Sequence, residues 1–316
     1  MDLYDNKLAE VASNPRFHFL EGDISINREW IEYHIKKCDV IVPLVAIANP
    51  AQYVTDPLRV FELDFEANLP IVRAAVRHRK RLIFPSTSEV YGMCADAEFD
   101  PERSDLVLGP INKPRWIYAC AKQLMDRVIH AYGQQDGLDY TLFRPFNCIG
   151  SGLDSINTAK EGSSRVITQF LGHIVRGEPI KLVDGGTQKR AFTYIDDGID
   201  ALMKIIENRG SVASGKIYNI GNPANNLSVR ELAERMLALA RQYPEYRESA
   251  AAATIVDTTA AEYYGSGYQD VQNRVPRIDN TRADLGWEPK VGMDDALRRI
   301  FDAYRGHVAD ARALVE

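Results

Sequence analysis

The chain has 316 residues, of which 45% are hydrophobic and 26% are charged, proportions typical of a globular protein that buries a full core. Its formal net charge of −6 argues against nucleic acid as a partner. The longest apolar run, Val40 to Ala48, is far shorter than the roughly 20 residues of a membrane span, so no membrane partner is expected.

The four cysteines lie far apart in the sequence and include no C-x-x-C pair. This pattern is typical of reduced, separately packed thiols in a cytoplasmic protein, and it predicts no metal site. The four positions are Cys38, Cys94, Cys120 and Cys148.

The first half of the chain alternates between apolar runs of strand length and segments with helical spacing of apolar residues. The continuous apolar run Asp39–Leu44 favours a strand buried on both faces. The alternation implies parallel βαβ units with helices on both faces of one sheet, and ligands of such sheets bind beyond the carboxyl ends of the strands. The expected helices are 4–14, 30–37, 57–78 and 118–132, and the expected strands are 17–20, 39–44, 81–85 and 140–143.

From about residue 146 the pattern changes to a loop-rich region with short strands. We therefore expect an α/β protein in which 1–145 form a Rossmann-like, doubly wound parallel sheet that binds a dinucleotide. Residues 146–316 are expected to form mainly a smaller substrate-binding lobe, interleaved with the first domain. Its expected helices are 164–176, 194–208, 228–243 and 293–306, and its expected strands are 179–183 and 216–220.

The N-terminal sequence lacks the glycine-rich turn with which a dinucleotide-binding fold ordinarily opens, since no glycine precedes Gly22. Met1–Leu3 is typical of the end of the second strand of such a fold, where an acidic residue, here Asp2, binds the adenosine ribose hydroxyls. The alternative is that Asp2 is only a frayed terminal residue. We expect that the first strand and the glycine loop, about 30 residues, are missing from the sequence.

Tyr118 and Lys122 stand four residues apart in a segment with helical spacing, so both side chains fall on one face of a helix. An ammonium group within about 4–6 Å lowers the pKa of an acid by roughly 1–3, which brings a tyrosine with a pKa near ~10 toward neutrality. Such a tyrosine can act as a base toward a sugar hydroxyl. The alternative is a chance pairing on a surface helix.

The strand-end run Ser86–Gly92 precedes this pair, and the combination resembles the core of the extended short-chain dehydrogenase/reductase family. Nearly the whole chain is similar to the UDP-glucuronic acid decarboxylases of that family, both the domain of a bifunctional polymyxin-resistance protein and the free-standing UDP-4-keto-pentose/UDP-xylose synthases. The segments that carry this resemblance are, in order, Glu21–Ser25, Val60–Glu66, Pro85–Met93, Asn112–Tyr118, Leu142–Asn147, Leu182–Arg190 and Gly267–Arg274.

The resemblance implies NAD as the cofactor, which oxidises the C4 hydroxyl of the sugar before the resulting β-keto acid loses CO₂. Tyr118 is then the base and Lys122 is its electrostatic partner. Glu89 and Arg274 match the decarboxylation pair of the family, with Ser88 beside the carboxylate. The alternatives are a strand-end cap for Glu89 and a surface salt bridge for Arg274. The implied cofactor contacts are Asp2, Asp23, Ile24, Tyr118 and Lys122.

The resemblance also implies a set of contacts to UDP-glucuronate. Lys189 and Arg190 suit its pyrophosphate, because forked guanidinium hydrogen bonds fit phosphate oxygens. Otherwise these two residues form a solvated turn. Cys148 and Ser151 stand where the family usually has Trp and Pro, so the substrate loop departs from the family pattern. The implied contacts are Ala48, Tyr53, Thr87, Ser88, Arg115, Asn147, Lys181, Lys189, Arg190 and Tyr268.

Glu89 favours a decarboxylase, because related epimerases typically carry a small residue there. We predict that the chain is a NAD-dependent, homo-oligomeric enzyme that converts UDP-glucuronate to UDP-4-keto-pentose, or onward to UDP-xylose, for lipid A aminoarabinose or other nucleotide-sugar synthesis. A UDP-hexose 4-epimerase or dehydratase is one alternative. A nucleotide-sugar-binding protein without turnover is the other, because the glycine loop is absent.

Overall fold

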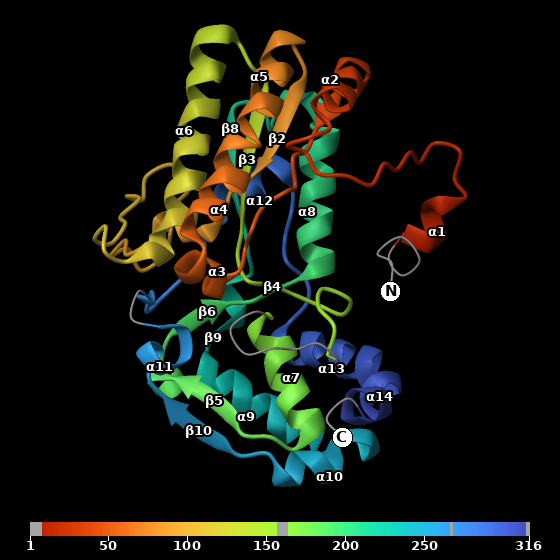
Figure 1. Cartoon of the computed structure of the whole chain (residues 1–316), viewed down its shortest axis with the longest axis vertical. Coiled ribbons are helices and arrows are strands. Elements are labelled where there is room, and N and C mark those ends of the chain that lie inside the picture. Colours follow the sequence, from red (N-terminus) through yellow and green to blue (C-terminus); the bar gives the residue numbers. More distant parts are fainter. Residues whose placement is uncertain (1–7, 157–163, 266–267, 314–316) are drawn as a thin grey trace.

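The computed structural model describes residues 8–156, 164–265 and 268–313 of the chain. Two lobes lie one above the other along the longest axis of the molecule (Figure 1). The upper lobe in that view contains a sheet between helices, and the lower lobe is mostly helical. Segments from both halves of the sequence build the upper lobe, because the chain returns to it after it has entered the lower one.

A four-stranded parallel sheet with the order β1-β2-β3-β8 forms the centre of the upper lobe. Strand β8 comes from the second half of the chain and pairs with β3, so that Asn219 lies opposite Arg144. The strands are β1 (Val40–Ile41), β2 (Arg81–Pro85), β3 (Tyr140–Pro145) and β8 (Lys216–Ile220).

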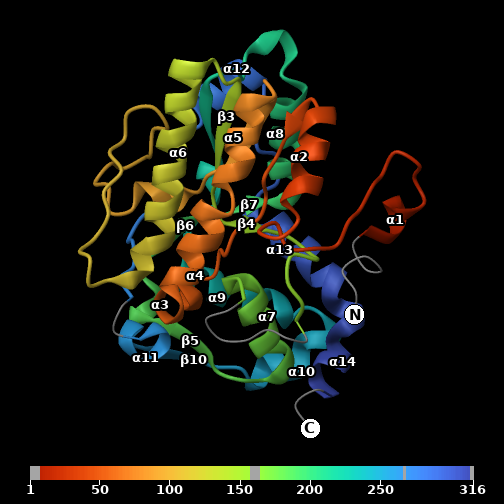
Figure 2. The ribbon, with the colours of Figure 1, turned by 45° about the horizontal axis from the view of Figure 1, so that its top comes forward.

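Side chains of β2 alternate between the two faces of this sheet, as the twofold period of a strand requires. Leu82 and Phe84 pack against helices α5 and α6, whereas Ile83 packs against α8 and α12. Figures 1 and 2 show these helices on opposite sides of the strands. The predicted Rossmann-like α/β fold is therefore confirmed. The covering helices are α2 (Arg28–Lys37), α5 (Leu69–Arg77), α6 (Ile117–Asp136), α8 (Ile195–Glu207) and α12 (Asp279–Leu285).

The lower lobe packs helices against one face of a short parallel strand pair, and this packing forms the largest hydrophobic cluster of the described residues. The strand pair is β5 (Ile180–Val183) and β10 (Ile255–Thr258), and the helices are α7 (Val166–Arg176), α9 (Val229–Ala240), α10 (Pro244–Ala252), α13 (Met293–Tyr304) and α14 (Val308–Ala313). Two further strand pairs lie where the lobes meet (Figure 1): β4 (Cys148–Ile149) with β7 (Thr193–Tyr194), and β6 (Lys189–Ala191) with β9 (Asn226–Ser228). The remaining α-helices are α1 (Ala9–Ala12), α3 (Pro50–Thr55), α4 (Pro57–Phe61) and α11 (Ala260–Tyr264).

The predicted strands 17–20 and 39–44 are corrected by the structure. Residues 17–20 are irregular, and only Val40–Ile41 of the second run forms a strand. Strand β1 pairs with β2 on one side, and no described strand pairs with its other side. Because residues 17–20 have no strand to pair with, Phe19 and Leu20 are 46% and 47% exposed.

The predicted helix 57–78 is divided into α4, a π-helical turn at Glu62–Glu66 and α5. The Nδ2 group of Asn68 donates to the carbonyl oxygens of Leu63 and Val45, at 2.8 and 3.0 Å. Pro70 follows and has no backbone N–H to continue a helical ladder. A side-chain donor and a proline thus interrupt a segment whose apolar spacing is continuous.

Candidate active site

The turn after β2 carries Glu89 to the carboxyl end of the sheet. This short 3₁₀ turn spans Ser88–Tyr91, and the Oγ1 atom of Thr87 caps it by accepting a hydrogen bond from the Glu89 amide at 3.2 Å. Gly92 ends the turn with a φ of +55°, a conformation that other residues rarely adopt. Thr87 and Ser88 are both buried, so the turn is held as part of the core.

Glu89 forms ion pairs with two arginines that come from different parts of the chain. Its Oε1 atom lies 2.6 Å from Nη1 of Arg274, and its Oε2 atom lies 2.9 Å from Nη2 of Arg115. Burial alone would raise the pKa of Glu89, but the two guanidinium groups outweigh burial and lower this pKa to about 2. Glu89 is therefore a carboxylate at neutral pH. Arg274 is almost fully buried in this pair, which differs from the surface salt bridge considered as an alternative.

Arg115 shares the single carboxylate of Glu89 with Arg274, so the three side chains together carry a net positive charge. The Arg115 side chain is 1% exposed and lies over the rings of Trp116 and Tyr268, at 4.4 and 5.2 Å from their centroids. Among the described residues, its Nε and Nη1 groups have no hydrogen-bond partner. The site thus holds a preorganised cation beside Glu89.

Tyr118 and Lys122 lie on α6, one turn apart, close to the Glu89 turn. Tyr118 stacks on Tyr53 with ring centroids 4.8 Å apart, and its hydroxyl hydrogen-bonds to Thr87. Burial raises the pKa of Tyr118, although Thr87 and the charge of Arg274 oppose this effect. The expected fall of this pKa toward neutrality is therefore wrong, because burial and the carboxylates Asp64 and Glu89 outweigh the two groups that lower the pKa.

Lys122 is also buried, and its ammonium donates to the Pro85 carbonyl oxygen at 3.0 Å and lies 4.7 Å above the Phe84 ring centroid. Burial lowers its pKa, whereas the neighbouring carboxylates Asp64 and Asp126 raise it. The hydrogen bond to the end of β2 fixes this ammonium one helical turn from Tyr118.

A cavity of about 580 Å³ opens between the lobes, in front of Glu89 and Arg274. Arg190 lines it and is held by Asp270, at 2.6 Å, and by the Val271 carbonyl oxygen, at 2.7 Å. Asn147 also lines it, in a left-handed conformation with a φ of +29°, and donates to the Ala191 carbonyl oxygen at 3.3 Å. The predicted site residues that line this cavity are Ala48, Glu89, Asn147, Lys181, Arg190, Tyr268 and Arg274.

Some predicted site residues lie outside this cavity. Lys189 is exposed on β6, so of the expected pyrophosphate pair only Arg190 faces the cavity. Asp23 accepts hydrogen bonds from Ser25, and Ile24 lines a separate cavity of about 260 Å³ against α2 and α5. Asp2 lies outside the described residues.

An aromatic and acidic group also lines the cavity, and of its members only Tyr268 was singled out in the sequence. Tyr264 stacks on Tyr268 with centroids 4.0 Å apart, and the Tyr263 hydroxyl donates to Gln169 at 2.6 Å. Asp270, the partner of Arg190, belongs to the same group. The available signal was the close spacing of three tyrosines and an aspartate over eight residues, 263–270.

Cys148, which departs from the family pattern, lines the cavity as well. Burial raises the pKa of its thiol to about 11, so this thiol is neutral at physiological pH. Within the described ranges, no three His, Cys, Asp or Glu side chains lie close enough together to hold a metal ion. None of the described helices is both long and apolar enough to span a membrane.

Asp64 provides the structural test for a cofactor near Tyr118 and Lys122. It is fully buried on the π-helical turn, and its Oδ1 atom accepts a hydrogen bond from the Ile47 amide at 2.7 Å. Its Oδ2 atom is buried without a partner among the described residues. Burial raises the pKa of Asp64 to about 6. An unpaired acceptor near a buried ammonium and a tyrosine hydroxyl fits the sugar hydroxyls of a nucleotide cofactor.

Comparison with known proteins identifies the family. Residues 3–221 match the family described as "NAD dependent epimerase/dehydratase family". The chain belongs to this family. The cofactor of the family is NAD, which agrees with the prediction and with the polar groups around Asp64, Tyr118 and Lys122.

Solved structures give the same result for the fold. The PbgP3 protein from Burkholderia pseudomallei is 70% identical, with a TM-score of 0.87, over 98% of this chain and 88% of that chain. A dTDP-glucose 4,6-dehydratase, DesIV from Streptomyces venezuelae, determined with NAD and TYD bound, is 22% identical (TM-score 0.76, 97% of this chain and 85% of that chain). A UDP-glucose 4-epimerase from Thermotoga maritima, determined with UDP-glucose, is 21% identical (TM-score 0.73, 92% and 85%). At these lower identities the likeness shows the fold alone.

Proposed function

We propose that the protein is a NAD-dependent oxidative decarboxylase that converts UDP-glucuronate to UDP-4-keto-pentose and CO₂. The observation that carries this proposal is the position of Glu89, which is bound to Arg274 and Arg115 at the edge of the cavity beside Tyr118. An enzyme that only oxidises and reduces a sugar hydroxyl needs Tyr118 and Lys122 but has no need for such a cluster.

The charges around the cavity suit an acidic nucleotide sugar. Four cationic side chains line the cavity (Arg165, Lys181, Arg190 and Arg274) against three carboxylates (Glu89, Asp154 and Asp270), which leaves an excess of positive charge. A sugar carboxylate and a pyrophosphate each bring negative charge, and arginine binds both groups through paired hydrogen bonds. The tyrosines that line the cavity offer aromatic surface on which a base can stack.

The proposed oxidation step uses Tyr118 and Lys122. NAD, when bound, would supply the hydride acceptor for C4 of the sugar, and Tyr118 takes the proton of the C4 hydroxyl. Burial disfavours the deprotonated form of Tyr118, and the Thr87 hydroxyl and the charge of Arg274 oppose this effect. In this proposal the ammonium of Lys122, one helical turn away, adds to their effect. The product is a 4-keto acid whose carboxyl group is β to the ketone.

The proposed decarboxylation step uses Arg274. The bond between C5 and the carboxyl carbon breaks, CO₂ leaves, and the bonding electrons form an enolate across C5, C4 and the C4 oxygen. A proton then replaces the carboxyl group at C5. A cation close to the developing charge lowers this barrier. Glu89, with a pKa of about 2, remains ionised and holds the Arg274 guanidinium in place.

The test is release of labelled CO₂ from carboxyl-labelled UDP-glucuronate in the presence of NAD. Arg274→Met should lower release by at least ~100-fold, the scale of losing one preorganised charged group. Arg277→Met is the matched control, because Arg277 lies on the same segment but is half exposed and paired with Asp279. This control should release CO₂ at nearly the wild-type rate, and titration with UDP should show that Arg274→Met still binds the nucleotide.

The main competing function is a UDP-hexose 4-epimerase or dehydratase, which would use the same Tyr118 and Lys122. If the wild-type protein releases no CO₂ but interconverts UDP-hexoses, the decarboxylase proposal is wrong and the epimerase replaces it. We also propose, from the resemblance, that the protein is cytoplasmic and homo-oligomeric. Light scattering of the purified protein would measure the oligomeric state.

A further inference from the structure

A line of buried polar side chains runs behind the candidate active site, from the end of β2 to the segment that carries Arg274. The Ser86 hydroxyl donates to Asp126 at 2.7 Å, and Arg144 donates to the same Asp126 oxygen at 3.2 Å. Arg144 also donates to the Tyr91 hydroxyl at 3.0 Å, and this hydroxyl donates to Oδ1 of Asn219 at 2.7 Å. All five residues are buried, so each hydrogen bond is shielded from water.

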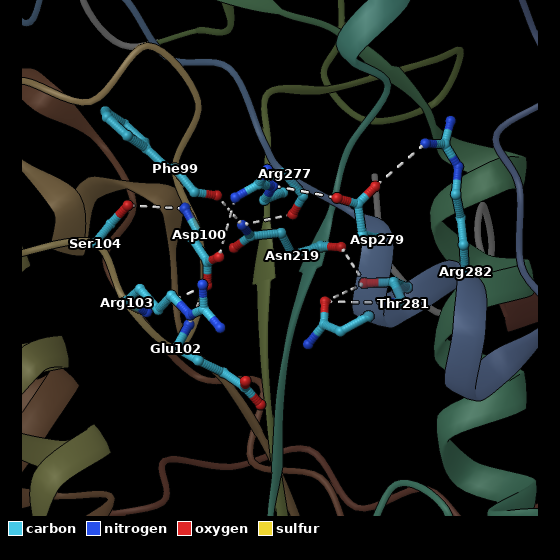
Figure 3. Close-up of polar contacts among 11 residues, drawn as sticks. Phe99, Asp100, Glu102, Arg103, Ser104, Asn219, Arg277, Asp279, Thr281 and Arg282 are labelled. Atoms are coloured by element: carbon cyan, nitrogen blue, oxygen red, sulfur yellow. Dashed lines mark hydrogen bonds and ion pairs between the residues drawn. The ribbon is translucent and has the colours of Figure 1, made fainter.

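Asn219 is where this line branches (Figure 3). Its Nδ2 group donates to the Phe99 carbonyl oxygen at 2.7 Å and to the Arg277 carbonyl oxygen at 3.1 Å. The backbone carbonyl oxygen of Asn219 accepts from the Thr281 hydroxyl at 3.0 Å, which ties β8 to α12. The side chain of Asn219 therefore uses its acceptor and both of its donors, and it is 0% exposed.

The two ends of the line flank Glu89 and Arg274. Ser86 and Tyr91 lie on either side of Glu89 in the sequence, and both are fixed by the line. Arg277 lies three residues after Arg274. Asn219 joins these two regions, because its side chain accepts from the Tyr91 hydroxyl and donates to the Arg277 carbonyl oxygen.

The segment between Arg274 and Arg277 has little freedom to move independently. The Phe99 amide donates to the Val275 carbonyl oxygen at 2.8 Å, and the Arg277 amide donates to the Phe99 carbonyl oxygen at 2.9 Å. Residues after Phe99 form a tight turn, in which Asp100 accepts from the backbone amides of 102 and 103 (Figure 3). A displacement at Asn219 is therefore transmitted to Arg274 through a stiff loop.

We propose that Asn219 is a positioning residue that sets the Glu89–Arg274 ion pair in the geometry needed for CO₂ loss. This inference rests on the proposed function, since it concerns the second chemical step of that reaction. Asn219 touches no substrate and does no chemistry itself. It acts by binding the Glu89 turn through Tyr91 and the Arg274 segment through Phe99 and Arg277.

The experiment compares Asn219→Ala and Tyr91→Phe with wild type in single turnovers that record NADH formation and CO₂ release separately. Tyr91→Phe removes one hydroxyl and keeps the packed ring, so it provides a folded variant if Asn219→Ala is too unstable. Asn222→Ala is the matched control, because Asn222 is a buried asparagine that donates to the Val291 carbonyl oxygen and contacts neither Tyr91 nor Phe99.

We expect the ratio of the CO₂ rate to the NADH rate to fall at least about tenfold in Asn219→Ala, within the ~100-fold cost of a 1 Å displacement. Tyr91→Phe should lower the ratio less, and Asn222→Ala should leave it unchanged even if its melting temperature falls. A merely structural role would reduce both rates in the same proportion, and that result would overturn the proposal. An unchanged ratio in Tyr91→Phe would do the same when Asn219→Ala does not fold.

Failure of the proposed function gives a different result, because wild type itself would then release no CO₂. In that case, crystal structures of wild type and Tyr91→Phe decide whether Asn219 positions the pair. An Arg274 Nη1 to Glu89 Oε1 separation that stays at 2.6 Å in the variant would overturn positioning, and a longer separation would support it.

Discussion

Glu89→Gln should destabilise the protein in a manner that depends on pH. The pKa of Glu89 is about 2, against an ordinary value of 4.5, because Arg115 and Arg274 outweigh the effect of burial. With 1.36 kcal/mol for each pH unit, this difference corresponds to about 3 kcal/mol of stability at pH 7. A glutamine has nearly the same shape and no charge, so the variant should lose about this amount and leave two buried cations without their counter-ion.

The direction with pH follows from the lowered pKa. Ionised Glu89 contributes its full stability above pH 4.5, and this contribution is lost as the pH falls toward 2. The difference between wild type and Glu89→Gln should therefore shrink to roughly half at pH 3. Urea denaturation at pH 7 and at pH 3, followed by circular dichroism, measures both differences.

Glu288→Gln is the control for this experiment. Glu288 binds Arg282 at 2.6 and 2.7 Å, but the pair lies on the surface, with side chains 58% and 42% exposed. Surface pairs contribute little because water and salt screen them, so this variant should unfold close to wild type at both pH values. If Glu89→Gln is also close to wild type at pH 7, or if its loss of stability does not change with pH, the buried ion pair does not stabilise the fold as described.

Three further predictions follow from single residues of the site. Tyr118→Phe should lower NADH formation from UDP-glucuronate and NAD by at least ~100-fold while UDP-glucuronate still binds, and normal NADH formation would show that Tyr118 is not the base. Asp64→Asn should raise the free energy of unfolding by up to about 3 kcal/mol at pH 8 and by much less at pH 4. The reason is that burial raises the pKa of Asp64 from 3.8 to about 6, so its charged form is penalised only above that pH. A lower melting temperature of the variant at pH 8 would contradict this. Gly92→Ala should lower the free energy of unfolding by about 1–3 kcal/mol more than Gly137→Ala does. Both glycines have a positive φ, but of the two only Gly92 would bring a Cβ against a backbone oxygen, that of Val107, at 1.9 Å. Equal thermal stability of the two variants would refute this prediction.

Local sequence patterns predicted several helices and strands of both lobes. The helix around Tyr118, the strands 81–85 and 216–220 and the helices predicted for 164–176, 228–243 and 293–306 lie close to their expected positions, whereas α10 and α14 were not predicted. The segment predicted as a helix at 57–78 is helical except for a turn at 67–68. Apolar spacing does not reveal this interruption, because Asn68 bonds to the carbonyl of Val45, 23 residues earlier. The strand predicted for 17–20 was wrong because a strand depends on its neighbour in the sheet as well as on its own residues.

The sequence allowed prediction of those site residues whose type and position match a family motif. Glu89 and Arg274 were singled out in the sequence by resemblance, and the structure brings them within 2.6 Å of each other. Their roles remain predictions. Asn219 could not be found in this way, because in the segment Lys216–Ile220 it is one polar residue in an ordinary strand. Its significance arises only when β8, the Glu89 turn and the Arg277 segment meet in three dimensions.

The position of β8 at the edge of the sheet has a consequence for how the protein is made. Strands β2 and β3 are complete once residue 145 has been synthesised, but the face of the sheet that carries Ile83 stays uncovered until α8 and α12 have been added. On the ribosome, the upper lobe therefore waits for most of the chain that follows residue 145, with part of its apolar surface uncovered in the meantime. Much of the lower lobe is translated within that interval, but α13 and α14 follow α12, so the lower lobe should reach its final packing only after α14 has emerged.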